Sequence, residues 1–155
     1  LLRSTTYPDP EADQGAHAFT YALYPHDGDW RQGTIAQARR LNYPLLVQPM
    51  PGGGTWLPVE FGLVACRTPG VMVDTVKKAE DSDSLIVRVY EAHGGRTRAA
   101  LVFATRIESA EEVNLLEEPT RPADVTADTL YVDLTPYQIR SFRIRLGDLL
   151  KQQLG

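Results

Sequence analysis

The middle of the chain constrains the fold most, because apolar and polar residues alternate through three consecutive segments. The segments cover residues 71–76, 85–90 and 98–105, and a period of two is the pattern of a half-buried strand. Gly94-Gly95 separates the last two, and glycine tolerates the positive φ that tight hairpin turns require. The pattern predicts a meander of three neighbouring antiparallel strands, whose apolar face needs a second layer to cover it.

Strand patterns also occur on both sides of this stretch. Further strands are predicted at residues 1–4, 17–25, 45–48, 56–67, 110–116, 129–134 and 141–146. The strand at 17–25 carries Phe19, Tyr21 and Leu23 on one aromatic-rich face, which predicts a core position. Prolines and glycines predict loops at 7–15, 49–54 and 119–127.

One helix is predicted, over residues 29–42. Asp29 and Gln32 have the spacing of a capping box, and apolar residues then recur at helical intervals until Pro44. Many strands, one helix and no alternation of strands with helices predict an all-β fold, an antiparallel β-sandwich with one short helix. Its 155 residues predict a single domain, residues 1–155.

The charge and cysteine content limit the classes of partner and compartment. A net charge of −4 and a pI near 5.3 provide no basic surface for phosphates, so neither nucleic acid nor an anionic membrane is expected as a partner. No segment approaches the roughly 20 apolar residues of a membrane span. The single cysteine, Cys66, is expected to be a small buried hydrophobe and is compatible with a cytoplasmic location.

The first four residues, Leu1-Leu2-Arg3-Ser4, suggest how this chain relates to a gene product. They contain no initiator methionine and have the character of a strand interior. We therefore expect the chain to be a piece of a larger protein.

The residues give no evidence for a metal site or a catalytic site of the chain's own. His17 and His26 are predicted to point to opposite faces of one strand, and no nearby cysteine or carboxylate completes a ligand set. His93 is expected to be a turn residue. The loop acids Asp9, Glu11 and Asp13, like Glu117 and Glu118, are interpreted as solvated surface charges rather than a glycosidase pair. No serine occupies a nucleophile elbow, and the glycines at 52–54 lack the Lys-Ser/Thr of a phosphate loop.

Several segments have residues in an order and spacing that resemble one known family. They are Arg3-Ser4, Tyr7-Pro8-Asp9-Pro10, Asp13-Gln14-Gly15-Ala16-His17 with the residues that follow to His26, Asp29-Trp30-Arg31, and residues 76–81, 88–95 and 134–140. Together they resemble the carboxy-terminal region of glycoside hydrolase family 38, the retaining α-mannosidases. The likeness is greatest to the bacterial and cytosolic branch and covers essentially the whole chain.

The resemblance implies a multidomain enzyme that cleaves terminal α-mannosyl residues. Zinc, or another divalent metal, and the aspartate nucleophile would lie in an amino-terminal domain outside this chain, so no catalytic or metal-binding residue is expected here and the chain alone should be inactive. Asp13, Gln14, Gly15, His17 and Arg3 would lie near the sugar. The alternative is that internal hydrogen bonds merely hold this loop in shape.

Two other functions remain open from the sequence. A β-sandwich with Trp30, Trp56 and several tyrosines could bind sugars by stacking on exposed rings, although both tryptophans are expected to pack inward. The sandwich could instead be purely structural, packing against amino-terminal domains of the same chain or building a homo-oligomer.

Overall fold

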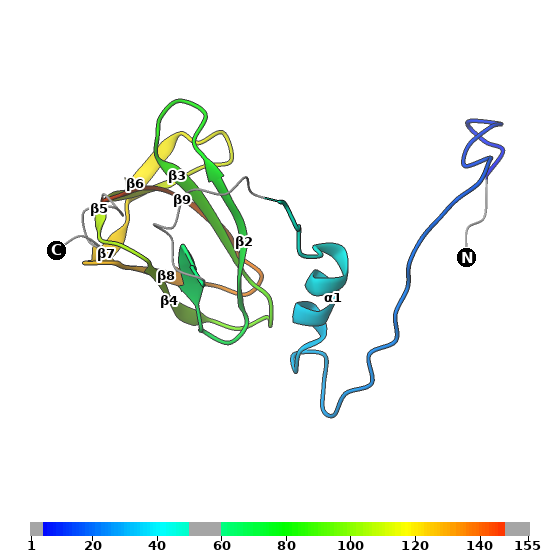
Figure 1. Cartoon of the computed structure of the whole chain (residues 1–155), viewed down its shortest axis with the longest axis horizontal. Coiled ribbons are helices and arrows are strands. Elements are labelled where there is room, and N and C mark those ends of the chain that lie inside the picture. Colours follow the sequence, from blue (N-terminus) through cyan, green and yellow to red (C-terminus); the bar gives the residue numbers. More distant parts are fainter. Residues whose placement is uncertain (1–4, 50–59, 148–155) are drawn as a thin grey trace.

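The computed structural model describes residues 5–49 and 60–147, and these form a β-sandwich with one helix beside it (Figure 1). The elements, in chain order, are α1 (Thr34–Asn42), β1 (Val64–Cys66), β2 (Val71–Lys78), β3 (Leu85–Glu91), β4 (Thr97–Phe103), β5 (Ile107–Val113), β6 (Pro119–Pro122), β7 (Asp124–Thr126), β8 (Thr129–Leu134) and β9 (Ile139–Leu146). The predicted all-β class with one short helix is confirmed.

Two antiparallel sheets form the layers of the sandwich. One has the strand order β1-β4-β8-β7 and the other the order β2-β3-β9-β5-β6. Side chains that alternate along the strands meet between the sheets and form the main core. The largest fully buried side chains of the described residues are Phe142, Ile86, Leu101, Leu130, Ile144, Val87, Val89 and Val132. All of these except Ile86 belong to the main core, which Cys66 also contacts from a half-buried position.

The predicted meander is wrong at its third strand. β3 pairs with β2 on one side, as predicted, but its other neighbour is β9, while β4 lies in the opposite sheet beside β1 and β8. The connection between β3 and β4 is therefore a corner between the layers rather than a hairpin. Alternation shows that a strand has a buried face, but it does not show which sheet supplies its neighbours.

The polar segment at residues 119–127 was predicted to be a loop, and this prediction is wrong. It contains β6 and β7, two short strands at sheet edges. Pro119 and Pro122 lie on β6, whose only partner among the described residues is β5, and proline is tolerated on an edge strand because one side of the strand needs no donor. The neighbouring strand predicted at residues 110–116 is β5, which begins and ends three residues earlier.

The amino-terminal part contains the largest correction. Residues 17–25 were predicted to be a core strand, but they form an exposed, extended segment that runs away from the sandwich (Figure 1). We call residues 5–33, which precede α1, the arm. The helix is also shorter than predicted, because residues 30–33 form a turn and Gly33 has a left-handed φ of 101° at the helix start. Residues 45–48, another predicted strand, are likewise extended and exposed. The strand at 1–4 and the glycines at 52–54 lie outside the described residues, as do residues 56–59 of the strand predicted at 56–67. Of the described residues 60–67, only Val64–Cys66 form a strand, β1, so the predicted strand is too long.

Helix α1 lies beside the edge of the five-stranded sheet. Arg39 near its end donates from Nη2 to the Val73 carbonyl at 3.1 Å and pairs with Asp74 at 3.2 Å, so the helix is attached to β2. No helix among the described residues is long and apolar enough to cross a membrane.

Candidate functional site

The Asp13 to His17 loop, the predicted sugar-facing segment, is held by hydrogen bonds within itself. A ring nitrogen of His17 lies 2.8 Å from the Asp13 carbonyl, and the Gln14 amide donates to the Pro10 carbonyl at 2.8 Å. Asp13 and Gly15 both have a positive φ, of 56° and 123°. These bonds agree with the alternative that internal hydrogen bonds hold the loop in shape. The residues of the loop are also exposed, so another surface can contact them.

The structure brings four of the five predicted site residues together and describes nothing of the fifth. Asp13 ends a turn over residues 10–13, Gly15 lies in a bend, and the His17 ring reaches back to the Asp13 carbonyl. By its colour, this part of the chain lies at the far end of the extended arm (Figure 1). No described atom lies within 4 Å of the position that a Cβ on Gly15 would take. Arg3 is outside the described residues, and a role at the sugar for any of the five stays a prediction.

Three of the segments that carry the family resemblance meet at the corner between β3 and β4. The centre of this corner is the buried carboxylate of Glu91, which is 3% exposed. It accepts hydrogen bonds from the backbone N–H groups of His93 at 2.8 Å, Gly94 at 2.8 Å and Tyr137 at 3.0 Å. One side chain thus joins the segment 88–95 to the segment 134–140.

The third segment reaches the same corner from the turn before α1. Arg31 Nε donates to the His93 carbonyl at 3.1 Å, and the Trp30 ring meets the His93 imidazole edge-on at 5.7 Å. Arg31 is held in place by Asp29 at 2.7 Å and lies over the Trp30 ring at 4.8 Å. Trp30 stays 40% exposed, so the prediction that it packs inward holds only in part.

The corner is tightly packed as well as hydrogen-bonded. Ala92 donates to the Gly70 carbonyl at 2.7 Å, and Gly70 has a φ of 73°. A Cβ on Gly70 would lie only 2.7 Å from the His93 ring, so glycine is required both for the backbone conformation and for the close approach. His93 is therefore a turn residue, as predicted, and it also anchors the arm.

The chemistry of Glu91 favours a structural role. Its burial works to raise the pKa of the carboxyl, but N–H donation by Tyr137, His93 and the two glycines that follow outweighs burial and lowers the pKa below its ordinary value. A carboxylate that holds its charge so firmly is a poor general acid at neutral pH. Glu112 on β5 also has a well-covered carboxylate, and hydrogen bonds from Arg140 and Arg121 lower its pKa.

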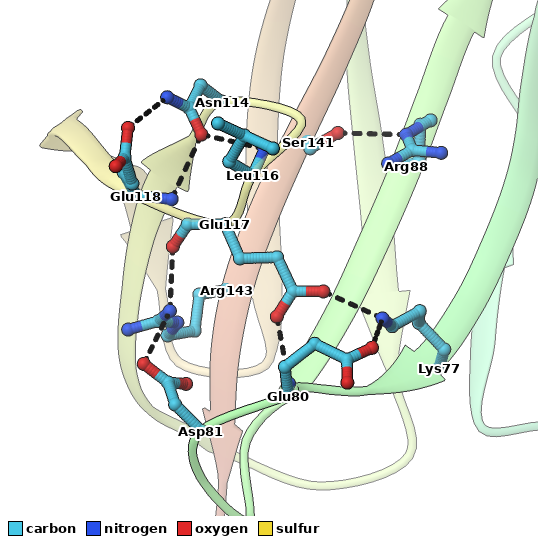
Figure 2. Close-up of polar contacts among 10 residues, drawn as sticks. All are labelled: Lys77, Glu80, Asp81, Arg88, Asn114, Leu116, Glu117, Glu118, Ser141 and Arg143. Atoms are coloured by element: carbon cyan, nitrogen blue, oxygen red, sulfur yellow. Dashed lines mark hydrogen bonds and ion pairs between the residues drawn. The ribbon is translucent and has the colours of Figure 1, made fainter.

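A second polar network closes the outer face of the five-stranded sheet, and Figure 2 shows its residues. Glu117 accepts from Lys77 at 2.7 Å and from the backbone N–H of Glu80 at 2.9 Å, while Arg143 donates to the Glu117 carbonyl at 2.7 Å. The donation from Lys77 lowers the pKa of the Glu117 carboxyl. These contacts tie the β2–β3 loop to the β5–β6 loop.

The loops joined by this network bury a small apolar cluster of Ala79, Ile86 and Val113. The interpretation of Glu117 and Glu118 as merely solvated charges is therefore wrong. Glu117 bridges the two loops, and Glu118 accepts from Asn114 Nδ2 at 2.7 Å, which shapes the β5–β6 turn (Figure 2).

A hollow of about 460 Å³ lies on the outer face of the sheet between this network and α1. Arg88, Tyr90, Tyr137 and Ile35 contribute to its walls, and Arg88 Nε donates to Ser141 Oγ at 3.0 Å. The exposed wall is mainly apolar, and its two carboxylates, those of Asp74 and Glu91, are already bound to Arg39 and to backbone N–H groups. The hollow is thus suited to contact with an apolar surface rather than to catalysis.

The residues present do not fit a zinc site. Within residues 5–49 and 60–147, no three His, Cys, Asp or Glu side chains are grouped so that they could hold a metal ion. Three well-covered carboxylates, those of Glu91, Glu112 and Glu117, already accept hydrogen bonds from backbone N–H, guanidinium or ammonium groups. Each of them would have to give up those hydrogen bonds before it could act as a metal ligand.

Sequence reasoning missed Glu91, although a signal was present. Leu85, Val87, Val89 and Glu91 share one face of β3, and the first three of these positions are apolar. An acidic residue on the apolar face, just before Gly94-Gly95, predicts a buried carboxylate that binds the backbone of a turn.

Comparison with known proteins agrees with the resemblance found in the sequence. Residues 70–142 match the glycosyl hydrolases family 38 C-terminal beta sandwich domain, and this range contains the corner and most of the sandwich. The chain is 36% identical to alpha-mannosidase 2C1 of Mus musculus, over 94% of the chain and 14% of the relative. It is 32% identical to alpha-mannosidase G of Dictyostelium discoideum, over 92% of the chain and 14% of that protein. The chain thus spans about one seventh of the length of these relatives.

Proposed function

Because the chain belongs to glycoside hydrolase family 38, through the carboxy-terminal β-sandwich domain of that family, we propose that it is part of a longer α-mannosidase. The proposed enzyme hydrolyses terminal α-D-mannosyl residues with retention of configuration. The observation that supports this most directly is the match of residues 70–142, which include the Glu91 corner, to the family's sandwich. A cytoplasmic location and a homo-oligomer stay predictions.

The proposed role of this chain in the enzyme is support rather than bond cleavage. Its well-covered carboxylates are fixed by N–H groups and arginines, and no metal-binding group occurs in the described part of the chain. The zinc and the nucleophile are therefore proposed to lie in the amino-terminal domains of the longer protein. The sandwich holds those domains, and the exposed loop of Asp13, Gln14, Gly15 and His17, with Arg3, lies near the sugar.

A carbohydrate-binding module is less well supported. Trp30 lies against His93 and under Arg31, so one face and one edge of its ring are already in contact with protein. A stacking platform for a sugar needs an open aromatic face.

The proposal is tested by the hydrolysis of a chromogenic α-mannoside. The full-length protein should turn over the substrate and lose activity after chelation of its metal, while the 155-residue chain should be inactive. Turnover by the 155-residue chain near that of the full-length protein would refute the support role, and an inactive, metal-loaded full-length protein would refute the α-mannosidase function.

The site role of the arm has its own test in the full-length enzyme. His17→Ala should lower kcat/KM about tenfold, or ~1.4 kcal/mol, with little change in Tm, if the loop faces the sugar. His26→Ala is a matched control, since His26 is also exposed. Its ring contacts the Asp27 carbonyl, the Thr34 hydroxyl and the Tyr24 ring. Equal kcat/KM in both variants would assign the loop to structure.

A further inference from the structure

Residues 16–24 have the composition of a strand but lack a strand's neighbours. Phe19, Tyr21 and Leu23 share one face, and Leu23 is 91% exposed. Within the described residues, no backbone hydrogen bond joins residues 16–26 to any other segment. An extended, apolar segment with free N–H and C=O groups on both edges is a template for strand pairing.

Residues 44–49 show the same features on the other side of α1. Leu45, Leu46 and Val47 are consecutive and between 94% and 96% exposed. They too lack backbone hydrogen bonds to any described residue. Such complete exposure of three neighbouring large apolar side chains is unusual for a folded surface and marks a site of contact.

The sandwich itself does not supply the missing neighbours. Helix α1 lies between the two segments in sequence and is fixed to β2 through Arg39. The inner side of residues 22–24 faces α1 across a hollow of about 480 Å³, and Tyr24 stacks on His26 there at 5.2 Å. Leu23 also borders this hollow but stays 91% exposed, and Phe19 and Tyr21, which share its face of the segment, do not line the hollow.

Building on the proposed function, we propose that residues 16–24 and 44–49 are strands of a β-sheet whose remaining strands come from the longer protein outside this chain. The partner of the two segments is thus the exposed edge of a β-sheet elsewhere in the same polypeptide. Apolar side chains of a second layer cover one face of that sheet. The curated relatives align with more than nine tenths of this chain, yet the aligned region makes up about one seventh of their length. Main-chain hydrogen bonds would provide the attachment of both segments, and in residues 16–24 the alternating apolar side chains would set the register.

The test is amide hydrogen exchange of the unmodified full-length protein. Residues 16–24 and 44–49 should exchange as slowly as β9, because their N–H groups would be bonded within a sheet. Exchange at the rate of an unstructured peptide in either segment would overturn the proposal. This measurement needs no variant and therefore does not depend on a variant's ability to fold.

A pair of substitutions in the full-length protein provides a second measurement. Leu46→Asp should lower Tm by several degrees, because it would bury a charge between the proposed sheet and the layer that packs against it. The matched control is Leu116→Asp, since Leu116 is also largely exposed but lies on the β5–β6 turn of the sandwich, and its Tm should stay unchanged. Equal Tm values for the two variants would overturn the proposal.

A second copy of the chain is the other possible occupant, and molecular mass measured in solution distinguishes it. Protection of the two segments in a monomer supports the proposal, and protection that disappears when a dimer dissociates overturns it. The α-mannoside assay separates this proposal from the proposed function. An inactive protein with both segments protected refutes only the function, whereas an active protein with both segments exposed refutes only the sheet.

Discussion

Strand β9 and residues 16–24 have the same alternating pattern and different surroundings. β9 is hydrogen-bonded to β3 and β5 along its length, and its Phe142 and Ile144 are buried between the sheets. The segment 16–24 has neither a ladder nor a cover among the described residues, and its apolar face is exposed. Alternation therefore indicates which face of a segment is to be buried, while the rest of the fold determines what buries it.

The two regions should therefore respond differently to the same substitution. Phe142→Ala should lower the free energy of unfolding of the 155-residue chain by roughly 3–5 kcal/mol, because it leaves a cavity in the core. Phe19→Ala should change it by less than ~0.5 kcal/mol, since that ring is mostly exposed. Urea unfolding of both variants measures the difference. Similar losses of unfolding free energy would contradict the difference in burial between the two regions.

The next largest effect is expected at the corner that fastens the arm to the sandwich. Glu91→Ala should cost about 1–3 kcal/mol in urea unfolding, because buried N–H groups of His93, Gly94 and Tyr137 lose their acceptor. Glu108→Ala is the control, since Glu108 is exposed and only pairs with Arg145 at the surface. A Glu91 variant as stable as the Glu108 variant would show that the carboxylate does not lock the corner.

The same carboxylate should give the stability of the chain a dependence on pH. The pKa of Glu91 is lower in the folded chain than its ordinary value of about 4.3, so the unfolded state binds its proton first as pH falls. The stabilisation by Glu91 is then complete well above pH ~4.3 and is lost as pH falls through the folded pKa. The difference in unfolding free energy between the parent chain and Glu91→Gln should shrink from pH 7 towards pH 3. A difference that stays constant over this range would contradict the assignment.

The smallest effect is expected where the arm touches the corner. Arg31→Ala removes the bond to the His93 carbonyl at 3.1 Å, and because the side chain is half-exposed the loss should be only about 0.5 kcal/mol. Amide exchange should become faster in residues 29–33 while β3 and β9 keep their rates. Faster exchange throughout the sandwich would mean that the arm stabilises the core, contrary to the difference expected between the exposed arm and the buried sandwich.

The sequence predicted the strands of the sandwich better than their arrangement. Residues 129–134 alternate cleanly and form β8 with the expected bounds. Assignment of β4 to the opposite sheet could not be predicted, because the pattern of residues 98–105 is the same whichever sheet supplies its neighbours. The edge strands β6 and β7 were missed because proline and polar residues are typical of loops as well as of sheet edges.

The candidate site was predictable only in its local chemistry. The cluster of polar residues at Asp13 to His17 correctly indicated a turn with internal hydrogen bonds as one alternative. Whether it faces a sugar depends on surfaces outside this chain, which its residues do not encode. The buried position of Glu91 was encoded, since it continues the inward-facing positions of β3.

Removal of the chain up to residue 28, which leaves the end of the arm at the corner, tests the difference in burial between the arm and the sandwich most directly. A chain that lacks residues 1–28 keeps α1, the Trp30 and Arg31 contacts and the whole sandwich, and its urea unfolding is compared with that of the 155-residue chain. The free energies of unfolding should agree within about 0.5 kcal/mol, because the described part of the deleted segment buries no side chain. A loss of several kcal/mol, or failure of the shortened chain to fold, would show that the arm is part of the folding unit and would contradict this account.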